Sequence, residues 1–302
     1  MDEKVIVLVS GFMACSISAV AVGYLVTKDK KTTETTGASP GTANLPGKPM
    51  PIPQMTKGSK PWNILRIGNP DKISSSAEGV KITYTVGKQG SEAGASFKAA
   101  PPGIPAKVAT LSYSVFVPES FAWSKPEIKS PGGKLPGLCI GTNSSDCATG
   151  GDWSPHAGSF RPMWREGGQV IGYSYHAING GGDAALNAQT AAFKSVANGT
   201  GRTGINLWHK QLGDGPKLQL KKGWNTISMT VDVGTPGKSD GSASLTVNGV
   251  TRKVTGVKWR EAANVKISNV DFVSFPGGST TDWAFKKPTY TLYKDFKFSA
   301  SG

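Results

Sequence analysis

The stretch from Gly158 to Tyr175, GSFRPMWREGGQVIGYSY, predicts a β-hairpin whose chain reverses at its paired glycines. Side chains two positions apart on a strand point to the same face of a sheet. The first arm therefore presents Ser159 and Arg161 together, and the second arm presents Tyr173 and Tyr175 together. A strand with a purely structural role rarely carries a cation, a hydroxyl and two phenols on its open face, so the hairpin is a candidate functional site.

The register of the hairpin decides whether these four side chains meet. If Arg165 pairs with Gln169 around a three-residue loop, Arg161 stands opposite Tyr173 and the serine opposite the second tyrosine, about 4.5–5.5 Å apart at Cβ. A two-residue turn at Gly167-Gly168 would shift Arg161 away from Tyr173 and scatter the group. We favour the three-residue loop because it turns the bulky apolar residues of the other face inward together: Phe160, Trp164 and Val170.

Alternation of apolar and polar residues with period two recurs through the chain beyond residue 62, whereas helical periodicity is scarce. Asn248-Gly249 is a strong hairpin signal between two such runs. Further strands are predicted over residues 80–86, 111–117, 227–233, 265–275 and 290–298, and the composition of residues 183–197 predicts the only helix. Many short strands separated by turns predict an all-β fold, an antiparallel β-jelly roll of two packed sheets.

The N-terminal segment has a different character. Residues 5–26 form an uncharged run of 22 residues, enough to cross a hydrocarbon core of roughly 30 Å as a helix. A cleaved signal peptide would need a positive start and a shorter apolar core, whereas this chain starts with Asp2-Glu3-Lys4. We therefore expect residues 1–31 to hold a retained single-pass anchor in a lipid bilayer. The lysines that follow the span favour a cytoplasmic position for the rest of the chain.

Residues 32–61 contain six prolines and almost no large apolar groups, which predicts a flexible, extended linker. Residues 62–302 then form one domain of a size that suits a single sandwich. The whole chain has a formal net charge of +14, which favours an anionic partner. Because the basic residues are scattered rather than clustered, we expect no specific nucleic-acid partner.

Cys139 and Cys147 bracket the short sequence CIGTNSSDC and are candidates for a disulfide, although two free thiols remain an equal alternative. Their spacing matches no common zinc pattern, and no calcium loop, P-loop or zinc-binding helix occurs, so no metal and no cofactor is expected.

Lys134 lies in the octet Pro131–Leu138, PGGKLPGL, where a lysine between glycines and prolines is by itself most often a surface charge. The octet, the SxR…YxY hairpin and a C-terminal FPGG segment at residues 275–278, followed by Trp283, together resemble polysaccharide lyase family 14. That family includes the alginate and glucuronate lyases of chlorella viruses. The resemblance implies a β-jelly roll that binds an acidic polysaccharide, with catalytic residues at Lys134, Ser159, Arg161, Tyr173 and Tyr175.

Two features depart from the family pattern: an extra segment at Pro126–Pro131, which could move Lys134, and the predicted anchor and linker. The residue types nonetheless suit β-elimination from a uronate, which removes the C5 proton beside the carboxylate and expels the C4 oxygen. Arg161 is expected to pair with the carboxylate. Either tyrosine could transfer the proton, and Lys134 could be the base or a stabilising charge.

Ser159 is expected to position a sugar hydroxyl. It does not lie in a G-x-S-x-G elbow, and no pair of convergent carboxylates supports hydrolysis. Trp153 and Trp208 lie in polar surroundings and are the better candidates for glycan contact. The alternative to a membrane-anchored viral lyase is a non-catalytic structural or glycan-binding jelly roll, a minor capsid protein tied to an internal membrane of a virion. In that reading, the chain contacts viral capsid proteins.

Overall fold

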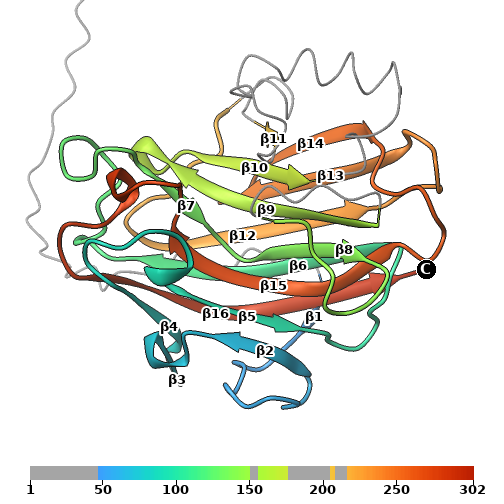
Figure 1. Cartoon of the computed structure of the whole chain (residues 1–302), viewed down its shortest axis with the longest axis horizontal. Helices are drawn as coiled ribbons and strands as arrows, with labels where there is room; N and C mark the ends of the chain where they lie inside the picture. The colour runs from blue at the N-terminus through green and yellow to red at the C-terminus, as the bar shows by residue number, and fades with distance from the viewer. Residues whose placement is uncertain (1–46, 150–155, 176–204, 208–215) are drawn as a thin grey trace, which may run out of the picture. The chain divides into compact units, whose positions relative to one another are not determined.

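The computed structural model describes residues 47–149, 156–175 and 216–302, together with the backbone of residues 205–207. These residues form two antiparallel β-sheets packed face to face, with four short 3-10 turns and no α-helix among them (Figure 1). The predicted all-β sandwich of jelly-roll type is confirmed. The helix predicted at residues 183–197 and the anchor at residues 5–26 lie outside the described residues. No helix in the described part has the length and apolar character needed to span a membrane.

The first sheet, called sheet A, has the strand order β14-β13-β12-β6-β16-β4-β3, and β1 pairs with β16. Its strands are β1 (Lys48–Pro49), β3 (Ile73–Ser76), β4 (Gly79–Tyr84), β6 (Val108–Val117), β12 (Gly223–Asp232), β13 (Gly241–Val247), β14 (Val250–Val257) and β16 (Thr289–Ser301).

The second sheet, called sheet B, has the order β11-β10-β9-β7-β15-β5-β2, and β8 pairs with both β15 and β9. Its strands are β2 (Ile64–Gly68), β5 (Ala95–Ala99), β7 (Gly132–Lys134), β8 (Gly137–Gly141), β9 (Ala157–Arg165), β10 (Val170–Tyr175), β11 (Ile205–Leu207) and β15 (Lys266–Pro276). The 3-10 turns are η1 (Pro70–Lys72), η2 (Gly90–Glu92), η3 (Glu166–Gly168) and η4 (Thr281–Trp283).

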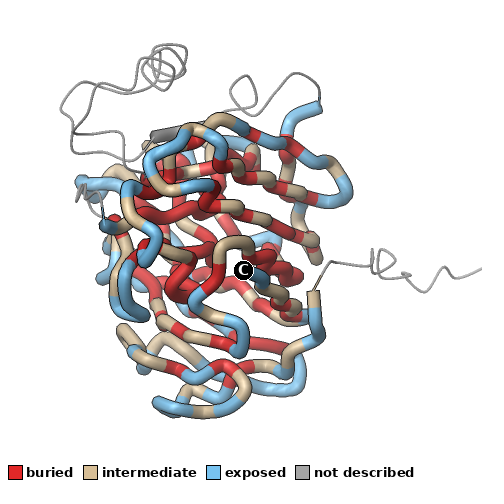
Figure 2. Tube along the Cα trace, turned by 90° about the vertical axis from the view of Figure 1, so that its right-hand side faces the viewer, coloured by how far each residue is buried: buried red, intermediate tan, exposed pale blue. Residues whose placement is uncertain are grey.

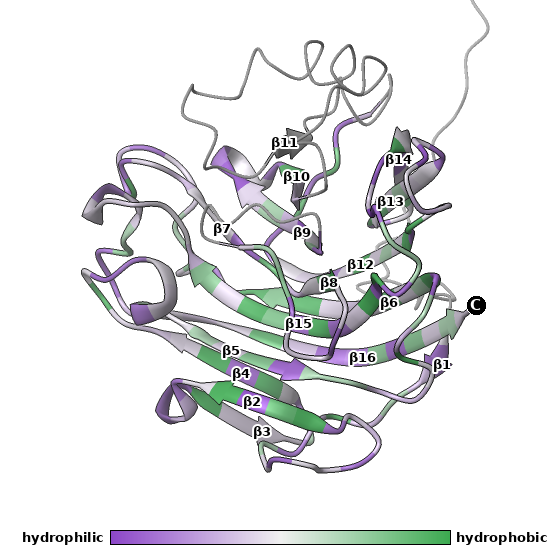
Figure 3. Ribbon diagram, turned by 45° about the vertical axis from the view of Figure 1, so that its right-hand side comes forward, coloured by the Kyte–Doolittle hydropathy of each residue, from purple (hydrophilic) through white to green (hydrophobic). Residues whose placement is uncertain are grey.

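The core lies between the sheets, where alternate residues of each strand meet. Figure 2 shows the buried residues gathered between the layers, and Figure 3 shows apolar and polar segments alternating along β15 and β16. Phe97 of β5 stacks on Phe272 of β15 at 4.3 Å between ring centroids, and Phe272 meets Tyr293 of β16 edge-on at 4.8 Å. Aromatic pairs of this geometry add to the energy of apolar burial.

Two predictions about strand and domain ends are wrong. Val86 was expected to share a buried face with Val80 and Ile82, but β4 ends at Tyr84 and a turn at Val86 and Gly87 leaves Val86 44% exposed. The linker was expected to run to residue 61, but Lys48–Pro49 pairs with β16, and Met50 and Ile52 pack against the core. Residues 47–61 therefore belong to the folded unit.

Candidate active site

The hairpin of β9 and β10 has the register that the three-residue loop predicts. Arg161 pairs with Tyr173 and Ser159 with Tyr175, while η3 supplies the turn. Gly167 and Gly168 adopt φ angles of 64° and 82° in that turn, a region that favours glycine. Phe160, Trp164 and Val170 are buried in the core, as expected. The opposite face of the hairpin, called the site face, carries the four polar side chains.

Lys134 comes to the same face from β7, which lies between β9 and β15. It pairs with Met163 on one side and with Phe275 on the other. The chain after Lys134 is anchored at two points, because Leu135 donates its backbone N–H to the Pro162 carbonyl at 3.0 Å and the Tyr113 hydroxyl donates to the Pro136 carbonyl at 3.0 Å. The extra segment before the octet therefore leaves Lys134 beside the hairpin cluster.

The electrostatic surroundings of Lys134 are unusual for a lysine. Its Nζ lies 5.6 Å from the ring centroid of Tyr173 and 5.3 Å from that of Phe275. Burial, together with the positive charges of Arg161 and Arg165, lowers the pKa of Lys134 to about 7, and the carboxylate of Asp271 on β15 partly opposes this shift. A substantial fraction of this amine is neutral near pH 7, so it can accept a proton there.

Arg161 is held differently from the prediction. It is only 1% exposed, and its Nη1 lies 3.0 Å from Oδ2 of Asp271 on β15 in a buried ion pair. Its Nη2 donates to the Ala148 carbonyl at 3.3 Å and to the Ser159 hydroxyl at 3.1 Å. Arg161 was expected to lie on the open face and to pair with a substrate carboxylate, whereas its guanidinium binds groups of the protein.

Ser159 shares this arrangement, because it is fully buried and donates its hydroxyl to the Ala148 carbonyl at 2.7 Å. Its expected contact with a sugar hydroxyl is therefore not supported by the geometry. Asp271 was missed in the sequence analysis. A single carboxylate inside the apolar run of β15 was the available signal, since a buried charge requires a partner.

The two tyrosines differ in exposure. Tyr175 is 1% exposed, whereas Tyr173 is partly exposed. Their rings meet edge-on at 5.5 Å, and their hydroxyl oxygens lie 3.2 Å apart. Tyr173 is thus the tyrosine that a bound molecule can contact, and Tyr175 lies behind it.

Residues 142–149, which follow β8, cover the Arg161 end of the site face. A disulfide joins Cys139 of β8 to Cys147 of this segment. The Asp146 carboxylate accepts hydrogen bonds from the backbone N–H groups of Thr142 and Asn143, which lowers its pKa. The same segment brings the Ala148 carbonyl to the arginine. Cys139 and Cys147 lie near Asp271, but bonded sulfurs offer no thiolates to a metal ion.

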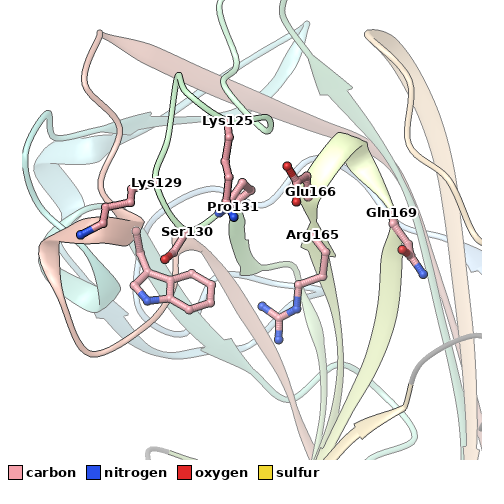
Figure 4. A pocket seen from close by; sticks show the side chains of 8 residues that line it. Lys125, Lys129, Ser130, Pro131, Arg165, Glu166 and Gln169 are labelled. Atoms are coloured by element: carbon pink, nitrogen blue, oxygen red, sulfur yellow. The ribbon is translucent and has the colours of Figure 1, made fainter. Parts of the chain in front are cut away.

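A pocket of about 340 Å³ opens at the other end of the site face (Figure 4). Arg165 and Gln169, from the hairpin, line one side, and Lys129 and Ser130 line the other. The Arg165 guanidinium lies 5.7 Å from the ring centroid of Trp283. Arg165 was not among the predicted site residues, although it lies four residues after Arg161, an even spacing that places it on the same face of the strand.

The remaining predicted positions, Trp153 and Trp208, lie outside the described residues. Another pocket, of about 580 Å³, lies on sheet A at the β-bulge of β16, near Lys294 and Lys297. It contains none of the predicted catalytic residues.

Comparison with known proteins identifies the family of this chain. A model of the polysaccharide lyase 14 family matches residues 72–296, which includes the octet, the hairpin and the C-terminal motif. The chain belongs to polysaccharide lyase family 14. No curated protein matches it in sequence.

Solved structures of alginate lyases share the fold of this family 14 lyase. Alginate lyase vAL-1 from a Chlorella virus is 22% identical, with a TM-score of 0.62 over 81% of this chain and 95% of its own. The marine alginate lyase from Aplysia kurodai is 24% identical, with a TM-score of 0.63 over 78% and 90%. Alginate lyase Aly36B is 23% identical, with a TM-score of 0.56 over 77% and 86%.

Proposed function

We propose that this family 14 lyase cleaves a polyuronate, of the glucuronan or alginate type, by β-elimination at the site face of sheet B. The observation that carries the proposal is the position of Lys134, a lysine with a pKa of about 7 beside the partly exposed Tyr173. The alginate lyase activity named for the Chlorella virus and Aplysia kurodai structures supports the same substrate class.

In the proposed reaction, the neutral amine of Lys134 takes the proton from C5 of the uronate. The electron pair of the broken C5–H bond forms the C4=C5 double bond, and the C4–O bond breaks. The Tyr173 hydroxyl gives its proton to the departing oxygen, so charge does not accumulate on the leaving group. The positive charges of the arginine side chains near Lys134 stabilise the enolate-like negative charge that develops on the uronate carboxylate.

Ser159, Arg161 and Tyr175 act as positioning residues in this mechanism. Arg161 ties the hairpin to β15 through Asp271, and Tyr175 lies within hydrogen-bond distance of the Tyr173 hydroxyl. A hydroxyl neighbour at this position can orient the Tyr173 O–H group and return a proton to it after each turnover.

The test measures the ultraviolet absorbance of unsaturated uronate ends released from polyglucuronate and alginate by the purified full chain. Because the neutral amine is the active form, kcat/KM should rise as the pH increases through about 7 and then level off. Lys134→Ala, Lys134→Arg and Tyr173→Phe should each reduce kcat by a factor on the order of 10²–10⁴.

Lys253→Ala, on the exposed side of β14, is the matched control and should retain the parent activity. A chain that releases no unsaturated ends, or a Lys134→Ala variant as active as the parent, would rule the mechanism out. The alternative function, a non-catalytic capsid or glycan-binding jelly roll, requires that the chain release no unsaturated ends.

Attachment to a bilayer through residues 5–26 and a place in a virus particle remain part of this proposal. The attachment rests on the apolar, uncharged character of those residues. The place in a virus particle rests on the similarity to the Chlorella virus lyase. Co-sedimentation of the full chain with lipid vesicles, compared with a chain that starts at residue 47, tests the attachment.

A further inference from the structure

We propose that Arg165, Trp283 and the segment Lys125–Pro131 form a carboxylate-binding subsite, which holds a uronate residue of the polymer next to the one that reacts. This inference rests on the proposed function, because it names the part of the same site that recognises the substrate's charge.

The pocket described above supplies the space. Its volume of about 340 Å³ is on the scale of a small-ligand cavity, and Figure 4 shows Lys129 and Ser130 on one wall with Arg165 and Gln169 on the other. Lys125, Lys129 and Arg165 bring three cations to its lining, against the carboxylate of Glu166 in the lining and that of Asp282, which pairs with Lys129 beside it. This balance favours an anionic ligand.

The pocket is close to the reacting groups. In the pairing of β7 with β9, Gly132 stands opposite Arg165, and Lys134 stands opposite Met163. Two residues along a strand cover about 7 Å. A polymer that places one uronate at Lys134 can therefore extend its neighbouring unit to Arg165 along the same face.

Arg165 has the chemistry that a carboxylate requires. Burial lowers its pKa to about 10, which leaves the guanidinium charged at neutral pH. Its planar fork can bind both oxygens of a carboxylate, and the partly buried setting strengthens such a bond. Trp283 offers an indole ring beside it, the type of surface on which sugar rings stack.

Two glycines of the family-like motifs make room for this pair. A Cβ on Gly132 would collide with Arg165 Nη1 and with the Trp283 ring, both at 2.6 Å, and a Cβ on Gly278 would collide with the Trp283 indole. Gly132 of the GGK sequence and Gly278 of the FPGG sequence therefore leave the space that Arg165 and Trp283 occupy.

The extra segment noted in the sequence builds the opposite wall. Ile128 is fully buried and anchors it, and Ser130 donates its backbone N–H to the Asp282 carbonyl at 2.9 Å. Lys129 Nζ lies 3.0 Å from Asp282 Oδ1 at the surface, and Lys286 Nζ donates to the Pro126 carbonyl at 3.2 Å. An anchored loop that carries two lysines to a pocket is a defined wall rather than a loose insertion.

The test uses the full chain with polyglucuronate and alginate and separates KM from kcat. Arg165→Gln should raise KM by roughly 10- to 100-fold, the loss expected for one charge-assisted pair, with a much smaller change in kcat. The double variant Lys125→Met with Lys129→Met should raise KM less and should make KM less dependent on salt. Lys253→Met removes one exposed charge elsewhere and should change neither KM nor its dependence on salt.

A second measurement separates this inference from the proposed function. Calorimetric binding of polyglucuronate and alginate is compared between Lys134→Ala and the combined variant Lys134→Ala with Arg165→Gln, neither of which needs to turn over. Weaker binding by the combined variant supports the subsite even when the parent shows no lyase activity. Equal binding, or an Arg165→Gln variant that loses kcat while keeping the parent KM, overturns it. If Arg165→Gln fails to fold, the exposed double lysine variant decides by the same criteria.

Discussion

Arg161 and Asp271 form an ion pair that solvent barely reaches, with side-chain exposures of 1% and 7%. The pair links β9 to β15, and the guanidinium also donates to the Ala148 carbonyl, the Ser159 hydroxyl and the Thr149 hydroxyl. Two buried charges cost much of their hydration, and their mutual attraction offsets that cost only while both are present. Arg161 therefore has a structural role in the site, and replacing it alone should lower the stability of the fold.

Arg161→Ala or Asp271→Ala should each destabilise the protein by about 3–5 kcal/mol, because each leaves one buried charge without its partner. The double variant Arg161→Met with Asp271→Leu should be closer to the parent than either single change. Urea unfolding of the parent, the two single variants and the double variant measures these differences in the free energy of unfolding. Strictly additive losses would show that the two side chains are not coupled.

At the same scale, the sequence predicted the partners of Arg161 across the hairpin but not its counter-ion. Tyr173 follows from local pairing, because turn length sets the register within the hairpin. Asp271 lies 110 positions along the chain, and only the order of the strands in sheet B brings it close. The prediction that Arg161 pairs with the substrate carboxylate rested on face assignment alone, and the buried ion pair with Asp271 contradicts it.

Among the elements, residues 142–149, which follow β8, cover the Arg161 end of the site face. The disulfide between β8 and this segment closes a separation of only eight positions, and the segment brings the Ala148 carbonyl to Arg161 and Ser159. Alternation could predict the strands on either side. It could not predict the segment's position, since irregular backbone carries no period.

Replacing both cysteines with alanine should lower the free energy of unfolding by about 2–3 kcal/mol, the chain-entropy effect of a short closed loop. Thermal unfolding of the parent with a reductant should approach that of the double variant. The same reductant should leave the double variant unchanged, and an equal shift in both proteins would assign the effect to something other than this bond.

Across the whole molecule, the strong alternation of β6, β12 and β16 made the two-sheet fold predictable. The boundary of the domain was harder to predict from the sequence. Residues 47–61 read as a proline-rich spacer, yet Met50 donates its backbone N–H to the Phe296 carbonyl at 2.8 Å, and Trp62 donates its indole N–H to the Pro51 carbonyl at 2.8 Å. Proline-rich sequence can pair along one edge of a strand, and composition does not reveal this.

A chain that starts at residue 47 should therefore fold with the thermal stability of the full chain. A chain that starts at residue 62 should melt at a lower temperature, because it loses the pairing with β16 and the apolar contacts of Met50 and Ile52. Circular dichroism melts of both chains provide the measurement. Equal melting temperatures would restore the boundary at residue 62.

The wall at Lys125–Pro131 also has a consequence for how such a lyase can be altered. It is fixed by two buried residues, Ile128 and Pro131, and by a few contacts with η4 and Lys286, while Lys134 and the hairpin are secured by the sheet itself. The wall can thus be exchanged as a cassette without disturbing the reacting groups. Grafting walls of different length and charge onto this scaffold offers a direct route to lyases with new polymer preferences.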